Sequence, residues 1–384
     1  MILDRRSLMA ALGAAPAESL PTLAFARTGD AAVQAALDRV FDRFAPVGLG
    51  AALVSREGVY ASGVRGLRRK DGTEPVQSTD AWHLGSNTKA MTAVLFARLV
   101  EQGRASWDLK LVEALPGEHD PAWSDMRVVD LMQHRAGLRD DDVLGQAWFM
   151  TARGDPASLP EQRLAVARKA LASAPGGTPG QFQYGNANYM VAAAAMEALT
   201  GQDWQALMVE QVFDPLGITS AGFGAPPEPA PWGHREMGGT TASLPPSHPG
   251  SDNPAALGPA GTVHMTLEDY GRFLAVFLND GQPLLQPASV ARLSEPAGGP
   301  PPAYGCGWIV LNQPWAGADG ATPGRVLAHD GSNTMWYASV AVAPARDLAL
   351  IAVSNDGTAG ARACPALLRA LIAGLPVAET GGVV

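Results

Sequence analysis

Ser86 and Lys89 lie three residues apart at the start of a predicted helix. Residues with this spacing share one helix face, so the Lys89 amine can reach the Ser86 hydroxyl. A serine hydroxyl is a poor nucleophile until a base takes its proton, and lysine can be that base when burial lowers its pKa. The start of a helix also offers backbone N–H groups for an oxyanion. The spacing alone is weak, because a helix-capping serine beside a solvated lysine gives the same pattern.

A second pair of polar residues, Tyr184 and Asn186, forms the only Tyr-x-Asn in the chain. The pair lies just before a predicted alanine-rich helix over residues 188–199. Residues two apart in an extended segment point the same way, so both polar tips can face one cleft. Tyrosine can serve as acid and base there, and asparagine can bind a substrate carbonyl. A turn that only caps the following helix is the alternative.

A third motif is His329-Asp330-Gly331, which ends one strand-like run and precedes another over residues 336–343. His-x-Gly is common, and His83-Leu84-Gly85 and His248-Pro249-Gly250 also fit it. Only the motif at 329 leads into a strand that is predicted to lie at an edge. We therefore expect residues 329–331 to line the same cleft.

The apolar pattern predicts strands at both ends of the chain and helices between them. Helical spacing predicts helices over residues 31–44 and 362–375, and it dominates the region from 86 to about 285. Residues 223–262 are rich in glycine and proline, so we expect a long binding loop or a surface excursion there. The predicted strands cover residues 49–54, 59–64, 326–327, 336–343 and 348–353. This order indicates an α+β fold, in which both ends of the chain build one sheet around an inserted helical region.

Composition excludes several classes of function. The 384 residues are 47% hydrophobic and 17% charged, which is enough for a sizeable core and unlike a disordered chain. The net charge is −9 with only four lysines, so a nucleic-acid partner is not expected. Apart from the N-terminal segment, no apolar run is long enough to span a bilayer, so no stable membrane insertion is expected.

Metal and cofactor motifs are absent from the sequence. Dinucleotide, P-loop, HExxH and GxSxG patterns are all missing. His234, His248 and His264 lack the spacing of metal ligands, so neither a metal nor an organic cofactor is expected. Cys306 and Cys364 could pair in an oxidising compartment, but we favour two buried apolar thiols.

The N-terminus has the features of an export signal. Arg5-Arg6 precede a small-residue apolar run over residues 7–17, and Ala24-Phe25-Ala26 gives an A-x-A cleavage pattern. We expect residues 1–26 to be a signal peptide, of the twin-arginine or the general type, and the protein to be periplasmic or secreted. The alternative is an N-terminal helix of the mature protein.

Taken together, the order Ser-x-x-Lys, Tyr-x-Asn, His-x-Gly resembles that of the β-lactamase-related serine hydrolases. This group includes class C β-lactamases, D-Ala-D-Ala carboxypeptidases, D-aminopeptidases and esterases. Residues 131–138, 214–218 and 258–261 are similar to further family segments, and the likeness runs roughly from Leu49 to Asp356. It implies an antiparallel sheet flanked by helices, with the site between the sheet and a helical sub-domain.

The resemblance also implies boundaries and roles. Residues 27–384 would form one catalytic domain, with an α/β part (27–80 and 303–384) and a mainly helical part (81–302). Ser86 would be acylated, with Lys89 and Tyr184 sharing the proton transfers. The groups implied to orient substrate are Asn186, His329 and Gly331, and the backbone N–H groups of Ser86 and Ser332 would form the oxyanion hole.

Three positions depart from the family pattern. His329 replaces the lysine of β-lactamases, Asp330 stands where carboxylate-binding members have Thr or Ser, and Asp140 falls where class C enzymes have a substrate-binding Gln. An Asp330 that faces the cleft would repel a substrate carboxylate, and His329 would be a cation whose charge depends on pH. The alternative is that Asp330 turns away and caps the turn at Ser332.

We therefore expect a serine hydrolase that cleaves an ester or amide in a small-molecule or peptide-like substrate through an acyl-enzyme. A D-Ala-D-Ala carboxypeptidase or a β-lactamase is the alternative of the same class. A catalytically silent binding protein of the same fold is the alternative of another class. The sequence leaves the oligomeric state open.

Overall fold

The computed structural model describes residues 29–115, 117–320 and 322–375. The predicted signal peptide, residues 1–26, lies outside the described residues. Within them, α2 (Gly29–Phe44) follows the predicted amphipathic pattern and buries Val33, Leu37 and Val40. The chain then enters the hairpin of β1 (Gly48–Ser55) and β2 (Gly58–Gly66), as the sequence predicted.

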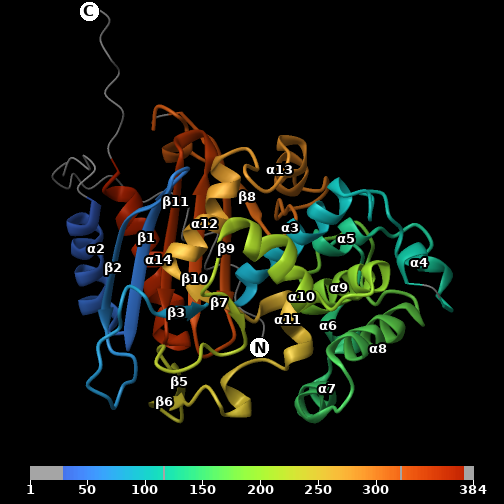
Figure 1. Ribbon diagram of the computed structural model, residues 1–384, viewed down its shortest axis with the longest axis horizontal. Coiled ribbons are helices and arrows are strands. Elements are labelled where there is room, and N and C mark those ends of the chain that lie inside the picture. The colour runs from blue at the N-terminus through green and yellow to red at the C-terminus, as the bar shows by residue number, and fades with distance from the viewer. Residues whose placement is uncertain (1–28, 116, 321, 376–384) are drawn as a thin grey trace, which may run out of the picture.

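A six-stranded antiparallel sheet joins the two ends of the chain (Figure 1). Its order is β2-β1-β11-β10-β9-β8, and β1 pairs with β11 from Leu49 opposite Ser354. The remaining strands are β8 (Ile309–Gln313), β9 (Gly324–Ser332), β10 (Tyr337–Ala343) and β11 (Leu348–Ser354). The predicted α+β fold, with its antiparallel sheet and flanking helices, is confirmed.

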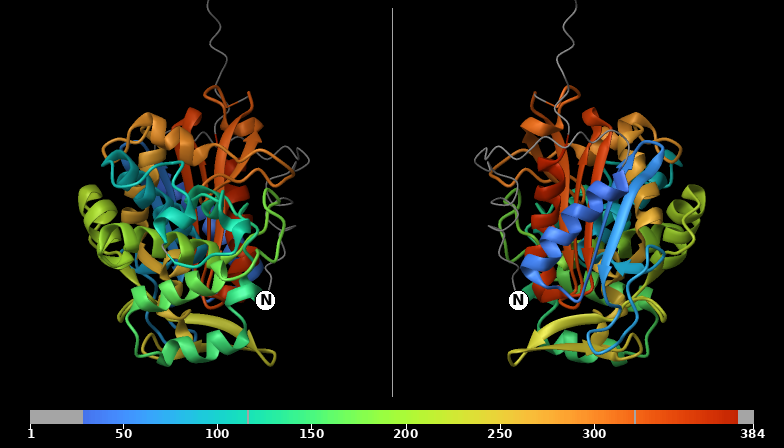
Figure 2. Two further views of the ribbon diagram at one scale, coloured as in Figure 1. Left: turned by 90° about the vertical axis from the view of Figure 1, so that its right-hand side faces the viewer. Right: turned by 90° about the vertical axis from the view of Figure 1, so that its left-hand side faces the viewer.

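Helices cover both faces of this sheet. α2 and α14 (Gly357–Ala373) pack on one face, as the right-hand view of Figure 2 shows for α2. α12 (Leu267–Leu278) packs on the other face, and Thr266 caps its N-terminus by accepting a hydrogen bond from the Asp269 N–H. Two hydrophobic cores result, one on each side of the sheet. Burial of this apolar surface provides the main stabilisation of the fold.

The helical region lies beside the sheet, at the right of Figure 1. Its principal helices are α3 (Thr88–Glu101), α5 (Val128–Met132), α8 (Leu159–Leu171), α9 (Asn186–Thr200), α10 (Trp204–Met208) and α13 (Pro287–Ser294). Shorter helices are α4 (Leu111–Ala114), α6 (Asp140–Val143), α7 (Gln146–Thr151) and α11 (Gly258–Gly261). A second sheet has three strands in the order β3 (Ala81–His83), β7 (Val263–Thr266) and β4 (Gly222–Phe223). β3 precedes α3 along the chain, and β7 leads directly into α12.

The expectation of a long loop over residues 223–262 was wrong in part. The segment contains a hairpin of β5 (Gly233–Met237) and β6 (Thr240–Leu244). Gly238 and Gly239, with φ of +60° and +82°, turn the chain between them. Paired left-handed residues suit a two-residue hairpin turn, so Gly-Gly was a usable signal in the sequence.

Cys306 and Cys364 are both free and buried. Cys306 belongs to the core between the sheet and the helical region, whereas Cys364 lies in the core under α2 and α14. The favoured interpretation, two buried apolar thiols, is confirmed. Burial also raises the pKa of the Cys306 thiol to about 12, which keeps it protonated.

Candidate active site

Ser86 lies in a short 3-10 turn, Gly85–Asn87, that leads from β3 directly into α3. Gly85 adopts a left-handed φ of +53°, and a Cβ at this position would lie 2.3 Å from the Ser332 nitrogen. Only glycine therefore fits between the turn and the end of β9. The close contact brings Ser86 against Ser332, as the oxyanion-hole prediction requires.

Lys89 is completely buried and makes three polar contacts. Its Nζ lies 3.0 Å from Ser86 Oγ, 2.9 Å from Asn186 Oδ1 and 2.7 Å from the Ala260 carbonyl oxygen. Desolvation lowers the pKa of the amine from 10.5 to about 7, and the charge of Asp140 acts in the opposite direction. The lysine is thus partly neutral near neutral pH, which a base requires.

The arrangement of these contacts orients the neutral amine. A carbonyl oxygen can only accept, so Asn186 and Ala260 take two N–H groups of Lys89. A neutral amine then has its lone pair left for the third contact, the Ser86 hydroxyl. Ala260 lies in α11, and sequence reasoning missed its role because a backbone carbonyl leaves no signal in a residue type.

Tyr184 contacts the same oxygen. Its hydroxyl lies 2.9 Å from Ser86 Oγ, and Lys89 Nζ sits 4.9 Å from the centre of its ring. Gly185 is extended, with φ −161°, and Asn186 is already the first residue of α9. The two polar tips therefore meet the same cluster, because Tyr184 contacts Ser86 and Asn186 contacts Lys89.

The third motif lies at the end of β9, where the strand has a neighbour on one side only. β8 pairs only with residues 324–328 of β9, so residues 329–332 have β10 on one side only. A Cβ at Gly331 would lie 2.0 Å from the Leu84 oxygen and 2.8 Å from the Ser86 nitrogen. Gly331 therefore allows the strand to approach the turn that carries Ser86.

His329 is not the pH-dependent cation that the sequence suggested. It is buried, with Nδ1 2.6 Å from the Asp330 carbonyl and Nε2 3.0 Å from the Tyr304 hydroxyl. The carbonyl can only accept, so Nδ1 carries the proton and Nε2 accepts from Tyr304. Desolvation, together with the charge of Lys89, lowers the pKa of His329 to about 3. The ring is neutral at physiological pH.

Asp330 does not face the cleft. Successive residues of a strand point to opposite faces, so Asp330 points away from the side on which His329 lies. Its carboxyl accepts hydrogen bonds from Tyr337 Oη at 3.0 Å and Ser339 Oγ at 2.6 Å. Desolvation raises the pKa of Asp330 to about 6. Asp330 turns away, but it does not cap the following turn; there Thr334 N–H donates to Ser332 Oγ.

Asp140 lies behind Asn186 and does not contact Ser86. It accepts hydrogen bonds from the Ala187 N–H at 2.8 Å and from Asn186 Nδ2 at 3.4 Å. A carboxylate at the N-terminus of α9 stabilises the helix dipole. Asp140 therefore holds the Asn186 side chain and the start of α9, and its role in substrate binding stays a prediction.

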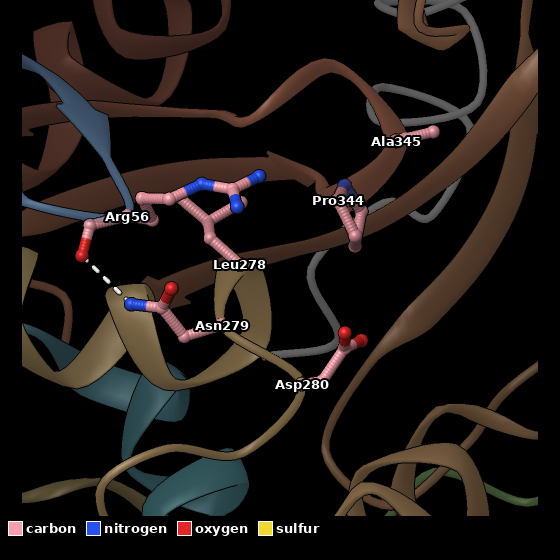
Figure 3. A pocket seen from close by; sticks show the side chains of 6 residues that line it. All are labelled: Arg56, Leu278, Asn279, Asp280, Pro344 and Ala345. Atoms are coloured by element: carbon pink, nitrogen blue, oxygen red, sulfur yellow. Dashed lines mark hydrogen bonds between the residues drawn. The ribbon is translucent and has the colours of Figure 1, made fainter.

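A surface hollow in the described part of the chain lies away from the Ser86 cluster. A hollow of about 310 Å³ lies beside Asn279, whose Nδ2 donates to the Arg56 carbonyl (Figure 3). It also contacts the turn after β10, at the end of the sheet opposite Ser332. Within residues 29–115, 117–320 and 322–375, no group of three His, Cys, Asp or Glu side chains could hold a metal ion. In the same ranges, every helix is too short or too polar to cross a membrane.

The chain has an antiparallel sheet, a helical region beside it, and a Ser-Lys-Tyr cluster between the two. This arrangement is typical of a class of hydrolases. The sequence matches the Beta-lactamase family over residues 37–374, and the chain belongs to that family. Its relatives include hydrolases that act on different substrates.

Four similar proteins illustrate this range. Penicillin-binding protein 4 of Amycolatopsis lactamdurans is 28% identical, over 78% of this chain and 77% of that protein. Esterase EstB of Burkholderia gladioli is 30% identical, over 54% of this chain and 55% of the esterase. The D-amino acid amidase from Ochrobactrum anthropi SV3 has the same fold, with a TM-score of 0.70 at 19% identity over 89% of this chain and 96% of the amidase. The match to Unguisins hydrolase ungD' of Aspergillus campestris, 25% identical over 87% of this chain, spans 63% of that relative's length.

Proposed function

We propose that this protein is a serine hydrolase that cleaves a neutral ester or amide through an acyl-enzyme on Ser86. One observation carries the proposal: Lys89 Nζ and Tyr184 Oη both lie within hydrogen-bond distance of Ser86 Oγ, at 3.0 and 2.9 Å. A nucleophile in contact with a base of suitable pKa is the arrangement that covalent catalysis needs.

In the acylation step, the Ser86 oxygen bonds to the substrate carbonyl carbon and its proton passes to Lys89. The carbonyl oxygen becomes an oxyanion, which the backbone N–H groups of Ser86 and Ser332 stabilise. The tetrahedral intermediate then collapses, the bond to the leaving group breaks, and Tyr184 donates a proton to the departing oxygen or nitrogen. Lys89 reprotonates Tyr184, which restores both groups.

Deacylation repeats these steps with water. Lys89, which is neutral again, takes one proton from the water as its oxygen attacks the acyl carbon. The ester bond to Ser86 then breaks, and the serine oxygen recovers a proton. The product is the carboxylic acid, and the enzyme returns to its starting state.

The third motif supports a substrate without a carboxylate. Penicillins and peptides that end in D-Ala carry a carboxylate, which a positively charged side chain binds most strongly. His329 is neutral and its two nitrogens are engaged by Asp330 and Tyr304. Asp330, which points away, adds no repulsion, so the preference rests on the missing cation. Esterases and D-amino acid amidases of this fold fit such a site.

The test is a substrate panel with purified protein. It contains short-chain aryl esters, D-aminoacyl amides, a chromogenic cephalosporin and a D-Ala-D-Ala peptide. We expect turnover of an ester or amide that exceeds that of the cephalosporin, and labelling of Ser86 by a serine-directed phosphonate. Ser86→Ala should abolish both, whereas Ser289→Ala, at a buried serine of α13, should abolish neither. Turnover that survives in Ser86→Ala would refute the mechanism, and absence of all turnover and labelling would favour the binding-protein alternative.

A further inference from the structure

A buried hydrogen-bond network outside the catalytic cluster centres on Asp252. This residue follows the short turn Pro249–Ser251 and is 8% exposed. One carboxyl oxygen lies 2.9 Å from His83 Nε2, and the other lies 2.7 Å from Asn333 Nδ2. His83 and Asn333 belong to segments that are far apart in the sequence, and each is next to one wall of the candidate site.

The first arm of the network holds the turn that carries Ser86. The Gly85 N–H donates to His83 Nδ1 at 3.1 Å, so this nitrogen is unprotonated and the imidazole proton lies on Nε2. His83 Nε2–H then donates to Asp252. The carboxylate therefore fixes both the ring orientation and the tautomer of His83, and the ring in turn fixes the backbone immediately before Ser86.

The second arm holds the turn that follows β9. Asn333 Nδ2 donates to Asp252, while Asn333 Oδ1 accepts from the backbone N–H groups of Met335 and Trp336, both at 3.0 Å. Its neighbour Ser332 is tied to the same turn, because Ser332 Oγ donates to the Trp336 carbonyl at 2.7 Å. The Asp252 carboxylate thus sets the backbone immediately after Ser332.

We propose that Asp252 is a positioning residue of the hydrolytic reaction, which fixes the spacing between the backbone N–H groups of Ser86 and Ser332. The inference rests on the proposed function, because those two groups are the oxyanion hole of the acyl-transfer mechanism. One carboxylate reaches both walls, so its geometry is transmitted to both donors at once. Donors that must meet an oxyanion lose much of their effect when they move by a fraction of an ångström to an ångström.

Packing around the network supports a rigid link. His83 stacks on Trp336 with ring centroids 5.5 Å apart, and both side chains are buried. Arg153 anchors the loop that carries Asp252 by donating to the Asp252 and Pro249 carbonyl oxygens at 2.7 and 2.8 Å. Asp252 contacts neither Ser86 nor Lys89 through any hydrogen bond in the described residues, so its effect must pass through His83 and Asn333.

The experiment compares Asp252→Asn with the wild type on the best neutral ester. Asparagine keeps the size of the side chain but places an N–H₂ group opposite either His83 Nε2–H or the Asn333 amide. We expect kcat to fall by about 10- to 100-fold with KM changed by less than about threefold, since an interaction made mainly in the transition state is weakened. Labelling of Ser86 by a phosphonate, whose phosphoryl oxygen enters the same hole, should slow by a similar factor.

A charge swap separates positioning from simple stabilisation. In Asp252→Asn/Asn333→Asp, residue 252 can still accept from His83 and donate to residue 333, whose carboxylate can still accept from Met335 and Trp336. The swap loses only the bonds from Asn253 N–H to Asp252 and from Asn333 Nδ2 to the Ser251 carbonyl. If Asp252→Asn lowers kcat about 100-fold, we expect kcat of the double variant to exceed that of Asp252→Asn by about tenfold or more.

A matched control and a second variant complete the design. Asp269→Asn changes another buried carboxylate that accepts several hydrogen bonds, from Thr219, Ser220 and Arg272, away from the site. It should lower the melting temperature without lowering kcat. If Asp252→Asn does not fold, His83→Gln is used, because glutamine keeps the donor to Asp252 but removes the acceptor for the Gly85 N–H; the same selective loss of kcat is expected.

The outcomes are separable from failure of the proposed function. A wild type that hydrolyses esters on Ser86, with Asp252→Asn or His83→Gln showing unchanged kcat and labelling, overturns the positioning role alone. A folded charge swap as slow as the single variant also overturns it. A wild type in which Ser86 is unreactive overturns the proposed function first, and the positioning role with it.

Discussion

The rate of acylation should depend on pH through Lys89. Its amine is fully buried, and desolvation lowers its pKa to about 7. Only the neutral form can take the Ser86 proton, so activity should rise with pH. With this pKa, about 9% of the amine is neutral at pH 6 and about 91% at pH 8, so kcat/KM should rise about tenfold between them.

A substitution of Asp140 can test whether the rise of kcat/KM with pH comes from Lys89. Its charge raises the pKa of Lys89, opposing the desolvation. Asp140→Asn removes the charge, while the asparagine oxygen can still accept the Ala187 N–H at the start of α9. The rising limb of kcat/KM should therefore move to lower pH in this variant, and activity at pH 6 relative to pH 8 should increase.

The assay is a pH series of kcat/KM with an uncharged aryl ester, so that the substrate itself does not titrate. The carboxyl of Asp330, with a pKa of about 6, titrates in the same range but on the opposite face of β9. Asp330→Asn is therefore the control, and its limb should coincide with that of the wild type. The assignment to Lys89 would be refuted if the rise of kcat/KM occurred at the same pH in Asp140→Asn as in the wild type. It would also be refuted if the rise disappeared in Asp330→Asn.

Tyr184→Phe and Lys89→Ala should each remove most of kcat, and the double variant should lose little more, because residues that act as one unit are not additive; multiplicative losses would indicate independent roles. The folded-state pKa of Asp330 is raised from 3.8 to about 6, so the stability contributed by its protonated form is present below the unfolded value and is lost as the pH rises through about 6. Because the residue is partly exposed, the free energy of unfolding of the wild type relative to Asp330→Asn should increase by at most about 2 kcal/mol from about pH 7.5 to about pH 4.5, as measured by urea denaturation; an opposite trend would contradict the raised pKa. Protein recovered from its native host should begin at Arg27 by mass spectrometry, and an intact N-terminus in a cytosolic fraction would contradict export.

Much of the site could be predicted because its chemistry requires particular residue types. A serine, a lysine and a tyrosine that share proton transfers must be present as side chains, and the structure brings Ser86, Lys89 and Tyr184 into contact. The orientation of Asp330 was also available in principle. Strand alternation places it opposite the face of its neighbours His329 and Gly331.

Other parts of the site left no readable pattern. The Ala260 carbonyl that binds Lys89 belongs to the backbone, so its identity as alanine carries no information. The pair of His83 and Asp252 joins residues from a short strand and an irregular loop, and no spacing rule connects them. Neutrality of His329 follows from burial and from its contact with Tyr304, which are properties of packing rather than of sequence.

The pairing of β1 with β11 has a consequence for how activity arises during synthesis. Leu49 pairs with Ser354, so the sheet closes only after nearly all of the described chain has left the ribosome. Contacts of such long sequence separation form slowly, because the intervening chain loses entropy on closure. Ser86 emerges early, but Ser332 and the end of β9 emerge late. A nascent chain therefore carries the serine without the surroundings that would activate it, and the proposed hydrolysis would begin only when the fold is complete.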